Sequence, residues 1–263
     1  MASLVPYPPP PGIDKYLPSP QRTGELFLTL TYATSLDSHL SIPLTQVPLS
    51  GPESKSLTHR LRTFHDAILI GVGTAIVDDP GLNSRLLGTP MTRQPRPVIL
   101  DPTFRWKITR ESRVVQTARR GEGLAPYIFV QSEVGIGEDE RKVILEEVGG
   151  KVVVIETSGE QRWSWHVLSE KMKELGLNSV MVEGGGGVIN GLLAEENLPL
   201  VDSVIVTIAP IYLGQDGVNV SPPAVLSAAA DGKRTLAVKF KDVEWRILGR
   251  DVVMLARPDL WHD

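Results

Sequence analysis

Cysteine is absent from the 263 residues of this chain. The absence excludes disulfides, thiolate zinc sites and cysteine nucleophiles, so redox chemistry needs a bound cofactor. Histidine is scarce as well, and its five copies show neither H-x-x-x-H nor H-E-x-x-H spacing: His39, His59, His65, His166 and His262. We therefore expect no metal site.

Long apolar runs and an excess of basic residues are also missing. No apolar run approaches the roughly 18 residues of a transmembrane helix, and the N-terminus lacks a basic-then-apolar signal. We expect no membrane partner and a cytoplasmic location. The net charge of −4 argues against nucleic acid as a partner. A hydrophobic content of 41% is enough for the core of a soluble globular protein.

Proline is concentrated at the N-terminus, where residues 1–23 contain Pro6, Pro8, Pro9, Pro10, Pro11, Pro18 and Pro20. This composition favours polyproline or extended conformations. We predict a proline-rich tail over residues 1–23 and a single domain over residues 24–263. The composition leaves open whether the tail docks on that domain or on a second subunit.

From Leu26 onward, strand patterns alternate with helix patterns. Apolar runs predict strands at Leu26–Ala33, Ala67–Val72, Val98–Leu100, Tyr127–Val130, Lys151–Ile155, Ser179–Val182 and Val201–Ile208. Helices are expected where Leu57, Leu61 and Phe64 share one face, and near 138–148, 163–175 and 187–196. The end of the chain predicts an antiparallel hairpin of Leu236–Ile247 with Asp251–Ala256, and the polar stretch Thr117–Leu124 predicts a surface loop. Together these patterns predict an α/β fold of three α/β/α layers with a mostly parallel central sheet.

The segment from Val180 to Asn190 joins a strand to a helix through four consecutive glycines. Glycines let backbone amides approach a ligand, and a helix start favours anions, so the turn is typical of a site for a phosphate-bearing cofactor. The strict G-x-G-x-x-G and G-x-x-x-x-G-K-[ST] patterns are not met. A glycine-rich connection chosen only for its turn geometry is the alternative.

A second glycine turn follows the strand that ends near Val72. Gly71 and Gly73 leave room for a ligand, Thr74 is suited to cap a short helix, and Pro80 ends that helix. Because ligands of open α/β sheets bind at the carboxyl ends of the strands, the two glycine turns are expected to face one crevice.

Three charged residues surround these turns. Arg62 and Arg85 flank the second turn, and arginine forks bind phosphate well, although most surface arginines are merely solvated. Glu183 directly precedes the four glycines and would repel a phosphate, so it should point toward a group rich in hydrogen-bond donors. An aminated heterocycle fits this description, and so does a nearby basic side chain.

Several motifs in order carry a family resemblance along the chain from about Leu26 to the final hairpin. They are Thr29–Asp37, His59–Arg62 leading into Asp66–Ile68, Gly71–Thr74 with Asp78–Pro80, Leu82–Arg85, Arg96–Asp101 and Val182–Asn190. In these motifs the chain resembles the reductases of riboflavin biosynthesis that act on 2,5-diamino-6-ribosylamino-4(3H)-pyrimidinone 5′-phosphate, particularly the stand-alone fungal type. Ser38 stands where many relatives have glycine, and Ser54 matches a substrate-contacting serine.

The resemblance implies a dihydrofolate-reductase-like fold, a homodimer and NADPH as the hydride donor. The positions that it assigns to NADP are Thr74, Asp78, Gly184, Gly185, Gly186, Gly187 and Val188. The positions that it assigns to the substrate, a phosphorylated pyrimidine, are Arg62, Leu82, Arg85 and Glu183. Gln131 and Ser132, and the strand that ends at Ile155, are further candidates for contacts with the adenosine end.

In the implied reaction the ribosylamino group opens to an imine, and hydride from the nicotinamide C4 reduces the sugar C1′ to give the ribitylamino product. Asp37 is our candidate proton donor, with a structural turn residue as the alternative. Three other functions stay open. They are a reductase of the deaminated pyrimidine or of a pterin, a non-catalytic nucleotide-binding protein, and an adaptor that acts through the proline-rich tail.

Overall fold

A computed structural model describes residues 4–19, 24–43, 45, 47–132, 137, 139–156, 163–222 and 236–260. Part of the predicted tail, including Pro20, and His262 lie outside these residues. The chain divides into two compact units. The first comprises residues 1–9, 18–27 and 56–185, and the second comprises residues 10–17, 28–55 and 186–263.

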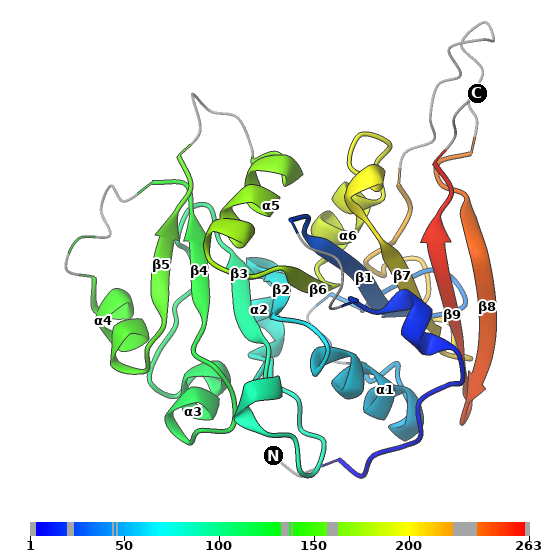
Figure 1. Cartoon of the computed structure of the whole chain (residues 1–263), viewed down its shortest axis with the longest axis horizontal. Helices are drawn as coiled ribbons and strands as arrows, with labels where there is room; N and C mark the ends of the chain where they lie inside the picture. Colours follow the sequence, from blue (N-terminus) through cyan, green and yellow to red (C-terminus); the bar gives the residue numbers. More distant parts are fainter. Residues whose placement is uncertain are drawn as a thin grey trace, which may run out of the picture. The chain divides into compact units, whose positions relative to one another are not determined.

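The first unit is built on five parallel strands (Figure 1). In spatial order they are β5 (Lys151–Val154), β4 (Tyr127–Val130), β3 (Arg96–Leu100), β2 (Ala67–Gly71) and β6 (Ser179–Gly184). The central strands are buried on both faces, which explains why they read as continuous apolar runs.

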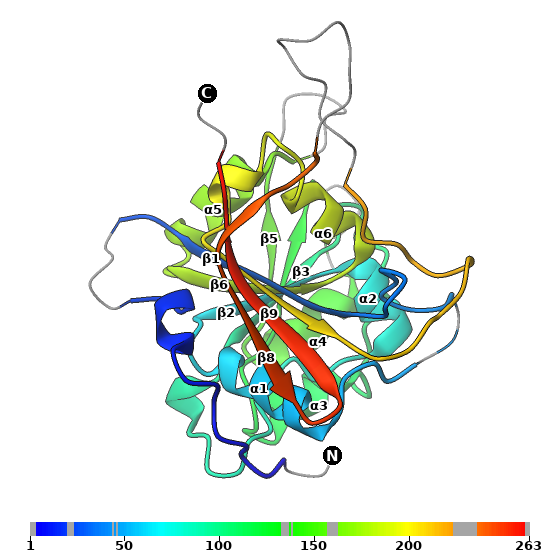
Figure 2. The ribbon, with the colours of Figure 1, turned by 90° about the vertical axis from the view of Figure 1, so that its right-hand side faces the viewer.

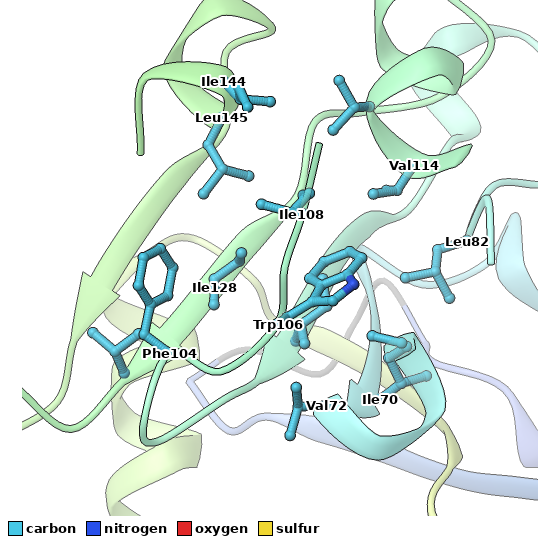
Figure 3. Packing of buried hydrophobic residues seen from close by; sticks show 14 of the residues in the cluster. Ile70, Val72, Leu82, Phe104, Trp106, Ile108, Val114, Ile128, Ile144 and Leu145 are labelled. Carbon is cyan, nitrogen blue, oxygen red and sulfur yellow. The ribbon is translucent and has the colours of Figure 1, made fainter. Parts of the chain in front are cut away.

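Helices cover both faces of these strands. They are α1 (Pro52–Arg62, from Ser56 onward), α2 (Val72–Asp78), α3 (Arg113–Arg119), α4 (Glu140–Glu147) and α5 (Trp165–Glu174). One core cluster joins Ile70 and Ile128 of the strands to Val114 of α3 and Leu145 of α4 (Figure 3). Figure 2 shows α5 on the opposite side of β3 from α2. This arrangement gives the three layers expected from the sequence.

The second unit contains parallel and antiparallel pairs. Strand β1 (Phe27–Thr34, from Leu28 onward) runs parallel to β7 (Ser203–Ile208), which is antiparallel to β9 (Asp251–Pro258). The last two strands, β8 (Phe240–Leu248) and β9, form the predicted hairpin. Helix α6 (Gly186–Leu192) and the 3₁₀ segments Ile13–Tyr16 and Leu198–Leu200 complete the unit, and a further 3₁₀ segment, Met91–Arg93, belongs to the first unit. The α/β fold with a mostly parallel sheet is thus confirmed.

Two local predictions need correction. The surface loop predicted at Thr117–Leu124 begins only after Arg119, because α3 extends to that residue and Thr117 is buried. The apolar signal of this helix lies just before the polar stretch, at Val114 and Val115. Thr74 does not cap α2, because Gly71 is the N-cap and no side chain takes part. Within the described chain, no helix is long and apolar enough to cross a membrane.

Candidate active site

The two glycine turns start at the carboxyl ends of adjacent parallel strands in the first unit. Ile70 of β2 pairs with Gly184 of β6, so the turns leave the sheet at the same edge. A Cβ placed on Gly184 would lie 3.5 Å from the Thr74 hydroxyl oxygen. The structure therefore brings together Thr74 and the start of the four-glycine segment, as the crevice hypothesis requires.

Glu183 occupies an irregular position in β6. The register with β2 passes from Leu69–Val182 to Ile70–Gly184, which leaves Glu183 as an extra residue in the strand. Such a bulge turns side chains away from the regular alternation and is common beside active sites. The apolar strand thus ends with a carboxylate, that of Glu183, which lies outside the regular pairing with β2.

The Glu183 carboxylate forms a bidentate salt bridge with Arg62 of α1. Arg62 Nε donates to Oε1 over 2.7 Å and Nη2 donates to Oε2 over 2.5 Å, and each side chain is only 13% exposed. The remaining nitrogen, Nη1, donates to the carbonyl of Asn83 over 2.7 Å. In this structure the donor-rich partner of Glu183 is thus a basic side chain, which is the second of the two alternatives.

Arg85 lies next to His59 of α1. The Arg85 backbone N–H donates to His59 Nδ1 over 3.0 Å, and its guanidinium Nη2 lies 3.2 Å from His59 Nε2. Partial burial, together with the positive charges of Arg62 and Arg113, lowers the pKa of the Arg85 guanidinium. Converging positive charges of this kind are suited to an anionic ligand.

The loop that carries Arg85 has an irregular backbone held by side chains. Leu82 is buried and has a φ of 55°, a left-handed value that is unusual for a leucine. Gln94 clamps Ser84, since Gln94 Oε1 accepts the Ser84 N–H at 2.7 Å and Nε2 donates to the Ser84 carbonyl at 2.9 Å. Asn83 Nδ2 donates to the Glu122 carbonyl. Strained loops of this kind persist only when their surroundings hold them.

The sequence reasoning missed these supporting residues. Asn83 and Ser84 fall inside the matching stretch Leu82–Arg85, and His59 begins another, so the motifs contained a signal for them. Gln94 lies in a loop between Met91–Arg93 and β3, where no local pattern marks it.

Asp78 and Thr74 both lie on α2. Removal from water raises the pKa of the Asp78 carboxyl, although this side chain still reaches solvent. Helix α2 ends at Asp78, and Asp79 follows with a left-handed φ of 40° before Pro80. The proline therefore terminates the helix, as expected.

The structural requirement for glycine differs among the four positions of the turn. Gly185 has a φ of 92°, a conformation that glycine alone adopts freely. Gly186 lies close to Val218, whose Cγ1 would be 2.8 Å from an added Cβ. Gly187 has no such neighbour within 4 Å. Turn geometry and packing thus explain Gly185 and Gly186, whereas nothing in the described chain requires glycine at 187. Val188 continues α6 and is half-buried.

Asp37 belongs to the second unit, where it anchors a turn. Its carboxylate accepts hydrogen bonds from the Ser35 hydroxyl and from the backbone N–H groups of Leu213 and Gly214, the last over 2.8 Å. The Ser35 hydrogen bond, followed by the two backbone bonds, holds the pKa of the Asp37 carboxyl well below its usual range. Such a carboxyl stays ionised at neutral pH, so the geometry favours the structural alternative over a proton donor.

Ser38 and Ser54 also have local explanations. Ser38 has a φ of 61°, a left-handed conformation that glycine adopts more freely than serine. Ser54 is fully buried in the first turn of α1, where its hydroxyl donates to Asp251. Asp251 also accepts the Gly51 N–H over 2.7 Å, so it caps α1 from the hairpin. The described residues contain no cluster that would hold a metal ion.

A mostly parallel α/β sheet with two glycine turns at one edge is consistent with a dihydrofolate-reductase-like fold. The chain belongs to the RibD C-terminal domain family, whose sequence model matches residues 26–254.

Named relatives cover nearly the whole chain. The 2,5-diamino-6-ribosylamino-4(3H)-pyrimidinone 5′-phosphate reductase of Candida glabrata is 37% identical over 257 residues, covering 94% of this chain and 96% of that protein. The enzyme of the same name from Eremothecium gossypii is 40% identical over 228 residues, covering 83% and 85%.

Solved structures of related proteins have the same fold as this chain. The riboflavin biosynthesis reductase Rib7 of Saccharomyces cerevisiae is 34% identical, with a TM-score of 0.74 and coverage of 94% of this chain and 97% of that one. RibD of Acinetobacter baumannii shares the fold with a TM-score of 0.69 at 21% identity, covering 90% of this chain and 59% of that one.

Proposed function

We propose that this chain reduces the ribosylamino group of 2,5-diamino-6-ribosylamino-4(3H)-pyrimidinone 5′-phosphate to the ribitylamino product, with NADPH as the hydride donor. The observation that carries the proposal is the similarity, over almost the full length, to reductases that bear this name. The paired Arg62 and Glu183 and the cationic Arg85 support it, because the substrate combines amino groups with a phosphate.

The residues proposed for the cofactor fit a pyrophosphate. An added Cβ on Gly73 or Gly187 would meet nothing within 4 Å, so the backbone is open to a ligand at both positions. Thr74 offers a hydroxyl beside Gly184. We assign Thr74, Asp78 and residues 184–188 to cofactor contacts. When bound, NADPH supplies hydride, and the protein supplies position and exclusion of water.

Four residues of the first unit are proposed for the substrate. Glu183 uses one acceptor position on each oxygen for Arg62, and a carboxylate has about four, so two remain for ring amino groups. Arg85 is proposed to bind the phosphate, and Leu82 to contact the substrate. Arg62 holds the Glu183 carboxylate in place. Asp37 is assigned to the turn that it anchors.

The experiment that tests the activity follows NADPH oxidation with the diaminopyrimidine phosphate, with its deaminated form and with a pterin as separate substrates, and repeats each assay with NADH. We expect oxidation of NADPH with the diamino compound. Turnover with another substrate alone assigns a different reductase. Binding of NADPH without reduction of any of them would support the non-catalytic alternative.

Replacing Glu183 by alanine tests the division between substrate and cofactor residues. The Glu183→Ala variant removes the acceptor positions proposed for the ring amino groups, so we expect the KM for the substrate to rise at least about tenfold, since a hydrogen bond to a charged group is worth about 1.5–3 kcal/mol. The dissociation constant of NADPH, measured by fluorescence, should stay unchanged. Glu174→Ala, on the exposed surface of α5, is the control. Loss of NADPH binding with an unchanged KM contradicts the assignment.

We propose that the chain forms a homodimer through an exposed apolar face of the second unit. Trp245 and Ile247 of β8 are 53% and 79% exposed and lie opposite Met254 and Val252 of β9. Residues paired in this way share one face, and β8 is an outer strand. A second copy of the chain is the occupant that this face fits. The cytoplasmic location stays a prediction.

A further inference from the structure

The N-terminal segment of the first unit lies against the loop that carries Arg85. The Leu4 N–H donates to the Arg85 carbonyl over 2.9 Å, and the Leu87 N–H donates to the Leu4 carbonyl over 3.2 Å. Together these bonds form a parallel bridge between Leu4 and Leu86. The backbone on both sides of the Arg85 carbonyl is thus held by a segment about 80 residues earlier in the chain.

The same segment is fastened to α1. The Tyr7 N–H donates to the buried Ser56 hydroxyl over 2.8 Å, and that hydroxyl lies 3.3 Å from the Val5 carbonyl. Arg60 Nη2 lies 3.4 Å from the Tyr7 carbonyl. Residues 4–7 therefore connect α1 with the Arg85 loop by hydrogen bonds at both ends.

The backbone of Arg85 is held both by α1 and by residues 4–7. The Arg85 N–H donates to His59 Nδ1 on α1, and the Arg85 carbonyl accepts the Leu4 N–H. The loop itself has no regular secondary structure, and Leu82 within it has a left-handed backbone. A guanidinium binds phosphate with paired hydrogen bonds only when its backbone is placed correctly. Pro6 stiffens the segment, which limits the entropy lost on docking.

We propose that residues 4–7 are a positioning strap, which orders the Arg85 loop for binding of the substrate phosphate. The inference rests on the proposed function, in which Arg85 binds that phosphate. Among the described residues, the hydrogen bonds of the strap reach Ser56, Arg60, Arg85 and Leu87 and none of the residues assigned to NADPH, so we expect its effect on the substrate alone. It gives the proline-rich start of the chain a role in substrate affinity.

The test uses the full chain with the Leu4→Pro substitution, which removes the N–H that the Arg85 carbonyl accepts, together with the half-buried leucine side chain. Val5→Pro is the matched control, because the Val5 N–H makes no hydrogen bond to another described residue and Val5 is 82% exposed. We expect Leu4→Pro to raise the KM for the diaminopyrimidine phosphate about three- to tenfold, the effect of ordering one loop side chain on binding. The kcat and the dissociation constant of NADPH stay within twofold.

A second pair of variants removes the attachment to α1. Ser56→Ala loses the hydroxyl that accepts the Tyr7 N–H and is expected to raise the KM in the same way. Ser169→Ala on α5 removes another buried helical hydroxyl and is its control. An unchanged KM in both Leu4→Pro and Ser56→Ala overturns the proposal, as does an equal rise in Val5→Pro.

Hydrogen exchange of residues 84–89 separates this proposal from the proposed function. Leu4→Pro should speed exchange of the Leu87 amide, which bonds to Leu4, whether or not the enzyme turns over. If the wild type reduces no candidate pyrimidine, the proposed function fails, and the exchange rates alone decide whether the strap orders the loop. Unchanged exchange in Leu4→Pro shows that it does not.

Discussion

At the scale of single residues, the Arg62–Glu183 pair joins two elements that are distant in the chain. Removing two charges from water is unfavourable, and their attraction offsets this only with good geometry and further hydrogen bonds. The pair meets both conditions, because its fork is bidentate and Asn83 accepts the remaining N–H. A largely buried pair whose carboxylate has acceptor positions left over from its bonds to the described residues is well suited to recognise a ligand that donates hydrogen bonds.

Asp37→Asn tests whether Asp37 acts as an acid. Because its carboxyl pKa is held well below the usual range, the group carries no proton at neutral pH, and we expect kcat to stay within about threefold of the wild type. The loss of charge-assisted bonds to the turn should lower the melting temperature. Asp216→Asn, at an exposed position, is the control. A kcat lower by two orders of magnitude in a folded variant restores the proton-donor hypothesis.

His65 makes stability depend on pH. Burial lowers the pKa of its imidazole from 6.5 to about 4, and its Nδ1 lies 2.8 Å from the Leu61 carbonyl. Between these two pH values the unfolded chain binds a proton that the folded chain does not. The stabilisation is therefore complete above pH 6.5 and falls as the pH drops toward 4, by about 3 kcal/mol in total.

The measurement is urea unfolding at several pH values in this window. His65→Gln should show a flatter dependence of the free energy of unfolding on pH than the wild type, and His166→Gln, on the exposed side of α5, should not. Equal slopes for the wild type and His65→Gln contradict the prediction.

At the scale of elements, the four-glycine turn contains glycines that the backbone or packing requires and one, Gly187, that we assign to ligand binding. Gly187→Ala places a methyl group where no neighbour lies within 4 Å, and alanine favours a helix over glycine by about 0.5–1 kcal/mol. We expect unchanged or higher stability together with at least tenfold weaker NADPH binding, because the methyl group blocks the backbone. Calorimetric titration and thermal melting measure the two effects.

Gly185→Ala is the contrasting variant, since its φ of 92° makes any side chain unfavourable. It should lose stability as well as affinity. NADPH binding that Gly187→Ala leaves unchanged would mean that the glycine at 187 has no role in the cofactor site.

The helices and strands also show which parts of the fold the sequence patterns predicted and which they missed. The strand predicted at Tyr127–Val130 is β4 with the same bounds, because a short apolar run of aromatic and β-branched residues marks it locally. Helix α3 was missed because only its first turn is apolar and polar residues follow. The bulge at Glu183 leaves no local mark, since it arises from the pairing of β6 with β2.

At the scale of the whole molecule, the apolar face of β8 and β9 predicts the oligomeric state. Wild-type protein should be a dimer at micromolar concentration by light scattering. Trp245→Glu combined with Ile247→Lys puts charges on the face and should give a monomer that still binds NADPH. Val167→Lys, at an exposed apolar position of α5, is the control. A monomeric wild type contradicts the proposed dimer.

The sequence by itself determined the fold class, the order of most strands and helices, the two glycine turns and the family. These properties follow from short-range patterns with periods of 2 and 3.6 residues and from motifs in a fixed order. Only the tertiary structure decided that Glu183 pairs with Arg62, 121 positions away, that Asp37 anchors a turn, and that Leu4 holds the Arg85 loop. Such contacts join segments far apart in the chain, so their geometry depends on strand register and packing, which no local pattern contains.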